Sequence, residues 1–286
     1  MPEAFLIQVM IGGTLAGAGT GMLGAYVVGM RVPFIGICIA HSALAGAVAG
    51  SLLGWPVVPA ALAGAVLAAV LLGAVDPERT RINTNMMMSV LLSLTMGLAF
   101  LGIATTGAAR NDLLALMWGS VLLCTGPELW LMAGVTAAEV AFVVLFHKEL
   151  RAILFSRTHA AAAGVPAAAV WTMLLVLTGV VLTVHFEVVG GLMIYALLTN
   201  PAIAAFQLTR GYGRSVLASA GLGGLSGFGG FLLSYATDLP TGAVIVIVSS
   251  ILVGVCGLLG HWRRRRGPPP PASAVASGPA EAQDGP

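Results

Sequence analysis

The sequence predicts an all-α polytopic membrane protein with about eight or nine transmembrane helices. Of its 286 residues, 58% are hydrophobic and only 8% are charged, and its mean hydropathy is +0.98. Charges are confined to short clusters, and residues 32–75 and 83–109 contain no Asp, Glu, Lys or Arg. A water-soluble domain needs charged residues on its surface, so this composition excludes a water-soluble fold.

The individual helices are predicted from runs of apolar residues. A helix needs about 20 such residues to cross the hydrocarbon core of a bilayer. About nine segments qualify: residues 4–29, 34–53, 57–75, 85–106, 129–146, 167–185, 188–207, 215–235 and 241–260. The run 113–125 is too short to span and suits a re-entrant or interfacial piece, and a count of eight spans stays open.

Basic residues gather at the ends of these segments and predict the orientation. They are Arg31, Arg79, Arg81, the stretch from Lys148 to Arg157, Arg210, Arg214, and the run from Arg263 to Arg266. Loops rich in Lys and Arg stay in the cytoplasm. Nine alternating spans then place the amino end outside and the carboxyl end in the cytoplasm, with Arg110 as the one exception.

The chain divides into one membrane domain and a tail. Residues 1–262 are predicted to form the transmembrane domain, which includes a cytoplasmic segment at 147–165. Residues 263–286 are basic and then rich in Pro and Ala, a composition typical of disorder. The formal net charge of +2 is too small to suggest nucleic acid as a partner.

Glycines recur at a spacing of four in the first two predicted spans. They are Gly13, Gly17 and Gly21, followed by Gly46, Gly50 and Gly54. This spacing places glycines on one helix face, where neighbouring helices can approach closely. We therefore expect the first and the second predicted spans each to pack closely against a neighbouring helix.

Two segments are predicted to depart from straight helices. The pair Gly190–Gly191 and then Asn200–Pro201 interrupt an apolar span, which predicts a broken or kinked helix. In lipid, such a break is tolerated where it faces protein or a water-filled cavity. The stretch 234–242, SYATDLPTG, predicts a tight polar turn with Asp238, Pro240 and Gly242 as turn residues.

Residues 147–159, HKELRAILFSRTH, predict an amphipathic helix on the cytoplasmic side. Gly164 and Pro166 follow, which suit the end of that helix and the start of the next span. Two interpretations stay open: a solvated connector, or a helix that docks on a cytoplasmic partner.

A few ionisable residues fall within or at the ends of apolar segments, where they are functional candidates. His41 suits either a buried imidazole or a lining residue. His185 and Glu187 suit either an external gate or the headgroup region. Glu139 faces a pathway or pairs with a polar neighbour.

Several blocks, taken in order, resemble the membrane permease of zinc/manganese/iron-class ABC importers. The blocks are FIGICIAHSALAGAVAG at 34–50, residues 112–119 with Pro127, residues 155–166, the VG…ALL…PA pattern within 189–202, and residues 234–242. Each block is weak alone, but five in order, spread over most of residues 5–260, make a specific resemblance.

The resemblance implies a transport subunit, not an enzyme. ATP hydrolysis is expected on a separate ABC ATPase chain, because this chain contains no GxxxxGK[ST] motif. Further implied partners are an extracytoplasmic substrate-binding protein, a second permease chain, most simply in a homodimer, and membrane lipid. No covalently bound cofactor is expected, and the implied cargo is a divalent metal ion, with His41 as a metal ligand.

The resemblance and the residues together give three candidate sets. The translocation pathway is expected to include Ile37, His41, Asn83, Glu139, His185, Glu187, Asn200 and Pro201. ATPase coupling is expected to involve Glu149, Arg151, Phe155, Ser156 and Gly164. Asp238, Pro240 and Gly242 form the structural turn.

The chain departs from the family pattern by losing negative charge. Family acidic positions are occupied here by Ile37, Asn83, Ser120 and Ser156. This leaves as alternatives a chelated or non-metal substrate, or a secondary carrier. A GxSG match at Ser226 suggests intramembrane serine proteolysis as another alternative, but that chemistry needs a histidine near the serine. Close packing of a helix rich in glycine and serine is the preferred interpretation.

Overall fold

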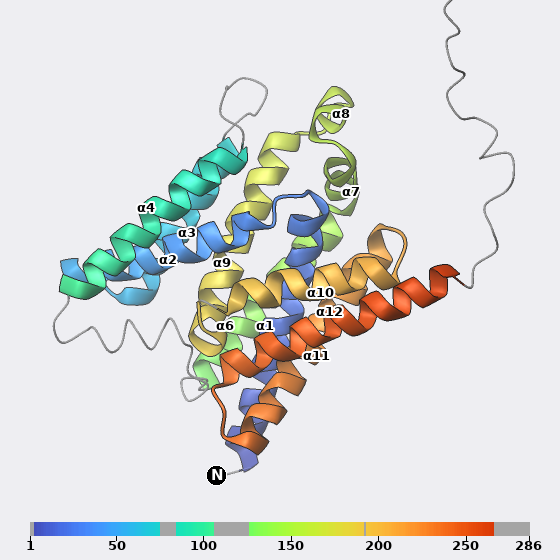
Figure 1. Ribbon diagram of the computed structural model, residues 1–286. Coiled ribbons are helices and arrows are strands. Elements are labelled where there is room, and N and C mark those ends of the chain that lie inside the picture. Colours follow the sequence, from blue (N-terminus) through green and yellow to red (C-terminus); the bar gives the residue numbers. More distant parts are fainter. Residues whose placement is uncertain (1–2, 75–83, 106–125, 192, 266–286) are drawn as a thin grey trace, which may run out of the picture.

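The computed structural model describes residues 3–74, 84–105, 126–191 and 193–265. Over these ranges the chain is helical and contains no strand, as predicted (Figure 1). Eight of the described helices are long and apolar enough to cross a membrane. They are α1 (Glu3–Gly29), α2 (Phe34–Leu53), α3 (Val57–Ala74), α4 (Thr84–Thr105), α6 (Gly126–Leu145), α9 (Ala167–Val189), α11 (Tyr212–Thr237) and α12 (Thr241–Arg265).

The seventh predicted span, residues 188–207, is shorter than the sequence suggested. Helix α9 ends at Val189, Gly190 adopts a φ of 92°, and α10 (Ile194–Leu208) has only 15 residues. At about 1.5 Å per residue, α10 is ~22 Å long, less than the ~30 Å of a hydrocarbon core. The prediction of a broken helix at this point is confirmed.

Helices α1 and α11 pack antiparallel through their glycines. A Cβ on Gly17 would meet the backbone of Gly223, and one on Gly21 would meet the carbonyl of Ser219. The Ser219 hydroxyl donates a hydrogen bond to the Gly21 carbonyl across this contact at 2.5 Å. The predicted close packing of the first span is therefore confirmed.

Helices α2, α3 and α4 form a second group, at the left of Figure 1. Gly46 of α2 packs against Ala60 and Gly64 of α3. This close approach again requires glycine, because a Cβ at Gly46 would strike the backbone of α3. Gly54 behaves differently: it caps α2 in the left-handed conformation with φ 70° and has open space around it. Helix α9 joins the two groups, packing on both α1 and α3.

Helix α10 runs parallel to α12 and packs along it (Figure 1). Asn200 contacts Ser249 and Ser250, and further along both helices Gln207 contacts Gly260. The two helices thus run towards the same end of the bundle.

The helix ends that carry basic residues lie together at one end of the bundle. One cavity is lined by the α1–α2 turn at 29–32, by Thr84 at the start of α4, and by residues 153–157. At the same end, the hydroxyls of Tyr26 and Tyr212 share a hydrogen bond of 2.7 Å, which ties the end of α1 to the start of α11.

Some predictions fall outside the described residues. These are Asn83, Arg79, Arg81, Arg110, Ser120, the run 113–125 and the tail from residue 266. Helix α12 continues past residue 262 to Arg265, so the first part of the basic run is helical. Cations in the last turn of a helix interact favourably with its dipole.

Candidate functional site

His41 lies on α2, one turn after Ile37 and on the same face. Its side chain is buried, and its ring Nδ1 has no hydrogen-bond partner among the described residues. Its polar neighbours on the helix are satisfied: the Cys38 thiol donates to the Met88 carbonyl at 3.2 Å, and the Ser42 hydroxyl donates to the Cys38 carbonyl at 2.8 Å. The imidazole therefore keeps a nitrogen with which it can bind a ligand.

A second polar cluster joins α1, α6 and α9. Glu139 is 0% exposed, and neither carboxyl oxygen has a hydrogen-bond partner in the part of the chain that the structure describes. Its Oε2 would lie 2.9 Å from a Cβ at Gly19, so the absence of a side chain there makes room for the carboxyl group. Thr136, one turn earlier on α6, faces the same glycine.

His185 of α9 completes this cluster. Its Nδ1 donates to the Val181 carbonyl at 2.6 Å, and since a carbonyl can only accept, this nitrogen carries the proton. Its Nε2 lies 3.4 Å from the Thr136 hydroxyl. The structure therefore brings His185 to Thr136, which lies one turn from Glu139 on α6 and near the same glycine, and the sequence did not predict this.

No complete metal site is present within the described ranges of this chain. Among them, no group of three or more His, Cys, Asp or Glu residues is placed to hold a metal ion. His41 lies on α2, apart from the α1–α6–α9 cluster. Structural metal sites use four protein ligands and catalytic ones about three. Any ion that His41 contacts must therefore take further ligands from elsewhere.

Asn200 and Pro201 lie in the middle of α10. The Asn200 amide donates to the hydroxyls of Ser249 at 3.0 Å and Ser250 at 3.1 Å, both on α12. Pro201 is buried inside the helix and has no N–H to donate to the carbonyl of Leu197. Asn200 thus holds α10 to α12 at the point where proline weakens α10. Glu187 lies in α9, and its side chain is outside the described set.

The predicted amphipathic helix is two short helices, α7 (His147–Phe155) and α8 (Arg157–Ala162), at the top of Figure 1. Ser156 separates them in an extended conformation and caps α8, since its hydroxyl accepts from the His159 N–H at 3.3 Å. Gly164 then adopts a φ of 84°, which ends the segment before α9. The capping serine explains why one predicted helix became two.

The two sides of α7 differ as an amphipathic pattern requires. Leu150 and Ile153 are buried, whereas Arg151 is exposed. Phe155, at the turn into α8, is 86% exposed, the largest exposed fraction among the described large hydrophobic residues. Glu149 is half-buried, and one of its carboxyl oxygens has no partner among the described atoms.

The turn between α11 and α12 has the predicted form. Asp238 caps α11 in the left-handed conformation with φ 53°, and Pro240 and Gly242 flank the start of α12. The Ser234 hydroxyl lies 2.6 Å from the Leu239 carbonyl and 2.9 Å from the Thr241 hydroxyl. These bonds fix the turn, which has a structural role.

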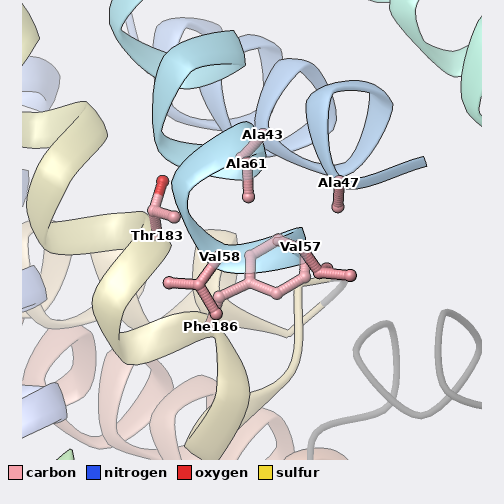
Figure 2. A pocket seen from close by; sticks show the side chains of 7 residues that line it. All are labelled: Ala43, Ala47, Val57, Val58, Ala61, Thr183 and Phe186. Atoms are coloured by element: carbon pink, nitrogen blue, oxygen red, sulfur yellow. The ribbon is translucent and has the colours of Figure 1, made fainter. Parts of the chain in front are cut away.

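A small cavity lies between α2, α3 and the far end of α9. Its volume is about 20 Å³, and one water requires roughly 10–15 Å³. Figure 2 shows Val57, Val58 and Phe186 side by side at this cavity, with Thr183 as its polar residue. The cavity is too small for a hydrated ion or an organic solute.

Ser226, the serine of the GxSG match, is buried in α11. Its hydroxyl donates to the Leu222 carbonyl of its own helix at 2.8 Å. Neighbouring Gly223 and Gly227 pack against α1. The tetrad therefore serves helix packing, as preferred from the sequence.

Comparisons with known proteins give a consistent result. The family model described as the ABC 3 transport family matches residues 3–258. The zinc transport system membrane protein TroC of Treponema pallidum is 30% identical over 91% of this chain and 93% of its own length. The manganese transport system membrane protein MntC of Halalkalibacterium halodurans is 25% identical over 87% of this chain and 85% of its own.

A solved structure, PsaBC from Streptococcus pneumoniae in complex with Fab, is similar in fold. It has a TM-score of 0.77 and 22% identity, over 88% of this chain and 90% of the matched chain. At this level of identity the likeness concerns the arrangement of the helices.

Proposed function

This chain belongs to the ABC 3 transport family, and from that membership we propose that it is the permease subunit of an importer for a divalent metal ion, manganese or zinc. A separate ABC ATPase would supply the energy, an extracytoplasmic binding protein would deliver the ion, and a second permease chain would complete the pathway. The end of the bundle with the basic residues would face the cytoplasm.

The observation that carries the ATPase-coupled part of this proposal is the exposed side chain of Phe155 at the turn between α7 and α8. Phe155 lies at the end of the bundle where basic residues gather, outside the long apolar spans, so lipid does not account for its 86% exposure. Aromatic side chains that fill a pocket of the partner commonly anchor protein–protein interfaces, and Phe155 is exposed enough to do so. We assign this turn to a cleft of the ATPase, with Glu149, Arg151, Ser156 and Gly164 supporting its shape.

Substitution of Phe155 tests the coupling role. We expect Phe155→Asp to abolish transport-linked ATP hydrolysis in the reconstituted complex, because a charge would oppose insertion into an apolar cleft. Phe155→Leu keeps apolar bulk and should retain most of the activity. Equal activity of both variants and the parent would contradict the assignment.

Within the membrane, we assign His41 as this chain's imidazole contribution to the pathway. Its unpartnered Nδ1 supports this, since imidazole nitrogen is a ligand for Zn²⁺ and other transition metals. Because Ile37 brings no charge, a dication would need compensating charge elsewhere. In a homodimer, the second copy would add its own His41, and Glu139 and Glu187 are the candidate carboxylates.

Metal uptake tests the choice of cargo. Cells that lack this chain should accumulate less manganese or zinc than parent cells when that metal is limiting, with the difference restored by the intact gene. Elemental analysis of washed cells measures it. Unchanged cellular content of both metals would rule out this cargo. The assignment as an ABC permease would still stand if an ABC ATPase co-purified with this chain from membranes.

A further inference from the structure

A large polar cavity lies at the basic end of the bundle, beside the α7–α8 turn. Its volume is about 530 Å³, within the ~300–1,000 Å³ typical of small-molecule sites. Its wall is formed by the α1–α2 turn, the start of α4, the α7–α8 turn and the first part of α9. Another sizeable cavity, of about 330 Å³ between α2 and α3, has an almost entirely apolar wall.

The polar side chains at this wall are hydrogen-bond donors of the kind that bind anions. Arg31 and Arg157 bring guanidinium groups, and Ser156 and Thr84 bring hydroxyls. Trp171 is buried, and its indole N–H has no hydrogen-bond partner among the described atoms. No aspartate or glutamate is among the residues described as lining the cavity.

Arg157 is held in place at this wall. Its guanidinium lies 5.1 Å from the centre of the Trp171 ring, within the range of a cation–π contact. The contact fixes one cation of the cavity on a buried aromatic ring, so that the charge is positioned before a ligand arrives.

Arg31 occupies a backbone position where glycine is usual. The Val32 N–H donates to the Val27 carbonyl at 3.1 Å, and the Arg31 N–H donates to the Val28 carbonyl at 3.0 Å. This pattern is a Schellman cap of α1, and Arg31 adopts the required left-handed conformation with φ 61°. An arginine is strained there relative to glycine, so its side chain is retained despite an unfavourable backbone.

We propose that this cavity binds a phosphate-bearing anion, either the headgroup of an anionic phospholipid or a soluble phosphate compound. Arginine guanidinium groups bind phosphate oxygens through paired N–H donors, and hydroxyls and an indole N–H add to them. The cavity is larger than one carboxylate side chain needs, and it lies where α1 ends and α4 begins, the depth at which lipid headgroups are expected. The inference does not depend on the nature of the transported cargo.

The position of the cavity gives the anion a consequence for the α7–α8 turn. Phe155, Ser156 and Arg157 line the cavity and also form that turn. A bound phosphate would bridge the turn to the end of α1 through Arg157 and Arg31. Occupancy would therefore order the segment on which a cytoplasmic partner docks.

Binding to the purified full-length chain tests the proposal in two arms. In one, native mass spectrometry counts phosphatidylglycerol retained after exposure to equal amounts of phosphatidylglycerol and phosphatidylcholine. In the other, inorganic phosphate is titrated in an uncharged detergent while tryptophan fluorescence is recorded. We expect saturable binding in at least one arm, and the arm that responds identifies the source of the phosphate.

The key variant is Arg31→Gly, which removes the guanidinium but suits the left-handed backbone. It should weaken phosphate binding at least tenfold while its thermal unfolding midpoint stays level or rises, which separates lost binding from lost folding. Arg157→Gln should weaken binding similarly. Arg214→Gln, an exposed arginine at the same end but away from the cavity, should bind as the parent does.

Three results would overturn the proposal. One is the absence of binding in both arms, and another is unchanged binding by Arg31→Gly. The third is an equal loss in Arg214→Gln, which would indicate diffuse attraction to a basic surface. A further outcome is that neither phosphate probe binds but Arg31→Gly lowers the affinity of the chain for an ABC ATPase. The cavity would then bind a carboxylate of the partner protein, and the phosphate assignment would be wrong.

Discussion

Glu139 is a carboxylic acid enclosed between three helices, with no hydrogen-bond partner on either oxygen among the described residues. Burying an unpartnered polar group destabilises a fold by about 1–3 kcal/mol, and more when the group is charged. Gly19 makes the space for it, and Thr136 and His185 form a polar neighbourhood beside it. A residue retained at such a cost is a candidate for use in another conformation of the protein.

We expect Glu139→Met to raise the free energy of unfolding by about 1–3 kcal/mol, because it replaces an unpartnered buried carboxyl with an apolar side chain of similar length. Unfolding in a detergent titration measures this. Glu139→Gln keeps an unpartnered polar group, so its free energy of unfolding should fall between those of the parent and Glu139→Met. A less stable Glu139→Met variant would show that the carboxyl is stabilised where it lies.

His41 is expected to affect transport more than folding. His41→Ala should reduce metal uptake at least tenfold in cells, while the purified chain still folds with a loss of about 1–3 kcal/mol, because the missing ring leaves a cavity at a buried position. Ser42→Ala, its neighbour on α2, is the matched control and should leave uptake unchanged. Normal metal uptake by the His41→Ala variant would show that the histidine serves only in packing.

At this scale the sequence identified the buried ionisable residues but not their neighbours. His41, Glu139 and His185 were recognisable because charge and imidazole are rare in apolar segments. Thr136 and Gly19 were not, because each belongs to the cluster only through contact between helices distant in the chain. Arg31 and Trp171 were missed as well, since a left-handed turn and an unpartnered indole leave no mark in a single sequence.

Helices α1 and α11 have close backbone contact at three successive glycines of α1. Gly13, Gly17 and Gly21 meet Gly227, Gly223 and Ser219 in turn, and a Cβ at each of these glycines of α1 would approach the backbone of α11. In lipid, where exclusion from water does not drive helices together, such close packing supplies much of the association energy. The contact therefore determines how α1 and α11 are placed relative to each other.

We expect Gly223→Ala to destabilise the protein by about 1–3 kcal/mol, because the added methyl group would strike the carbonyl of Gly17. Gly221→Ala, two residues earlier on the same helix, has nothing within 4 Å of its added Cβ. It should be neutral or stabilising by up to about 1 kcal/mol, because alanine favours helix over glycine. Unfolding midpoints of the two variants, measured side by side, check this; equal midpoints would contradict it.

The sequence predicted the helices well where hydrophobicity alone decides. The spanning helices were predicted from long apolar runs, and the four-residue glycine spacing predicted the packing of α1. It also predicted the break at Gly190–Gly191, but it failed at Ser156, which divides α7 from α8 where one helix was expected. A capping hydroxyl or a positive φ is decided by local geometry, which composition does not encode.

For the whole molecule, the structure gathers the basic helix ends on one side, and the α2–α3 and α11–α12 turns, which carry no basic residue, lie at the opposite ends of their helices. This arrangement agrees with alternating spans in which α10, although short, still leads from one side to the other beside α12. Which side faces the cytoplasm stays a prediction from charge.

Cysteine labelling checks that orientation. With the native cysteines replaced by serine, a single cysteine at Asp238 should react with a membrane-impermeant maleimide added to intact cells, because its turn is predicted to lie outside. A cysteine at Arg214 should react only after the cells are opened. Labelling in the reverse order would invert the topology and remove the basis for placing the α7–α8 turn at an ATPase.

The contact between α1 and α11 has a consequence for biosynthesis. Ser219 and Gly21, which join across it, are 198 residues apart in the chain. At ~5–20 residues per second, a ribosome needs roughly 10–40 s to make the intervening segment. During that time α1 lies in the bilayer with its glycine face uncovered, so fragments that end before α11 should be recognised by membrane proteases, and assembly of the bundle awaits the last quarter of translation.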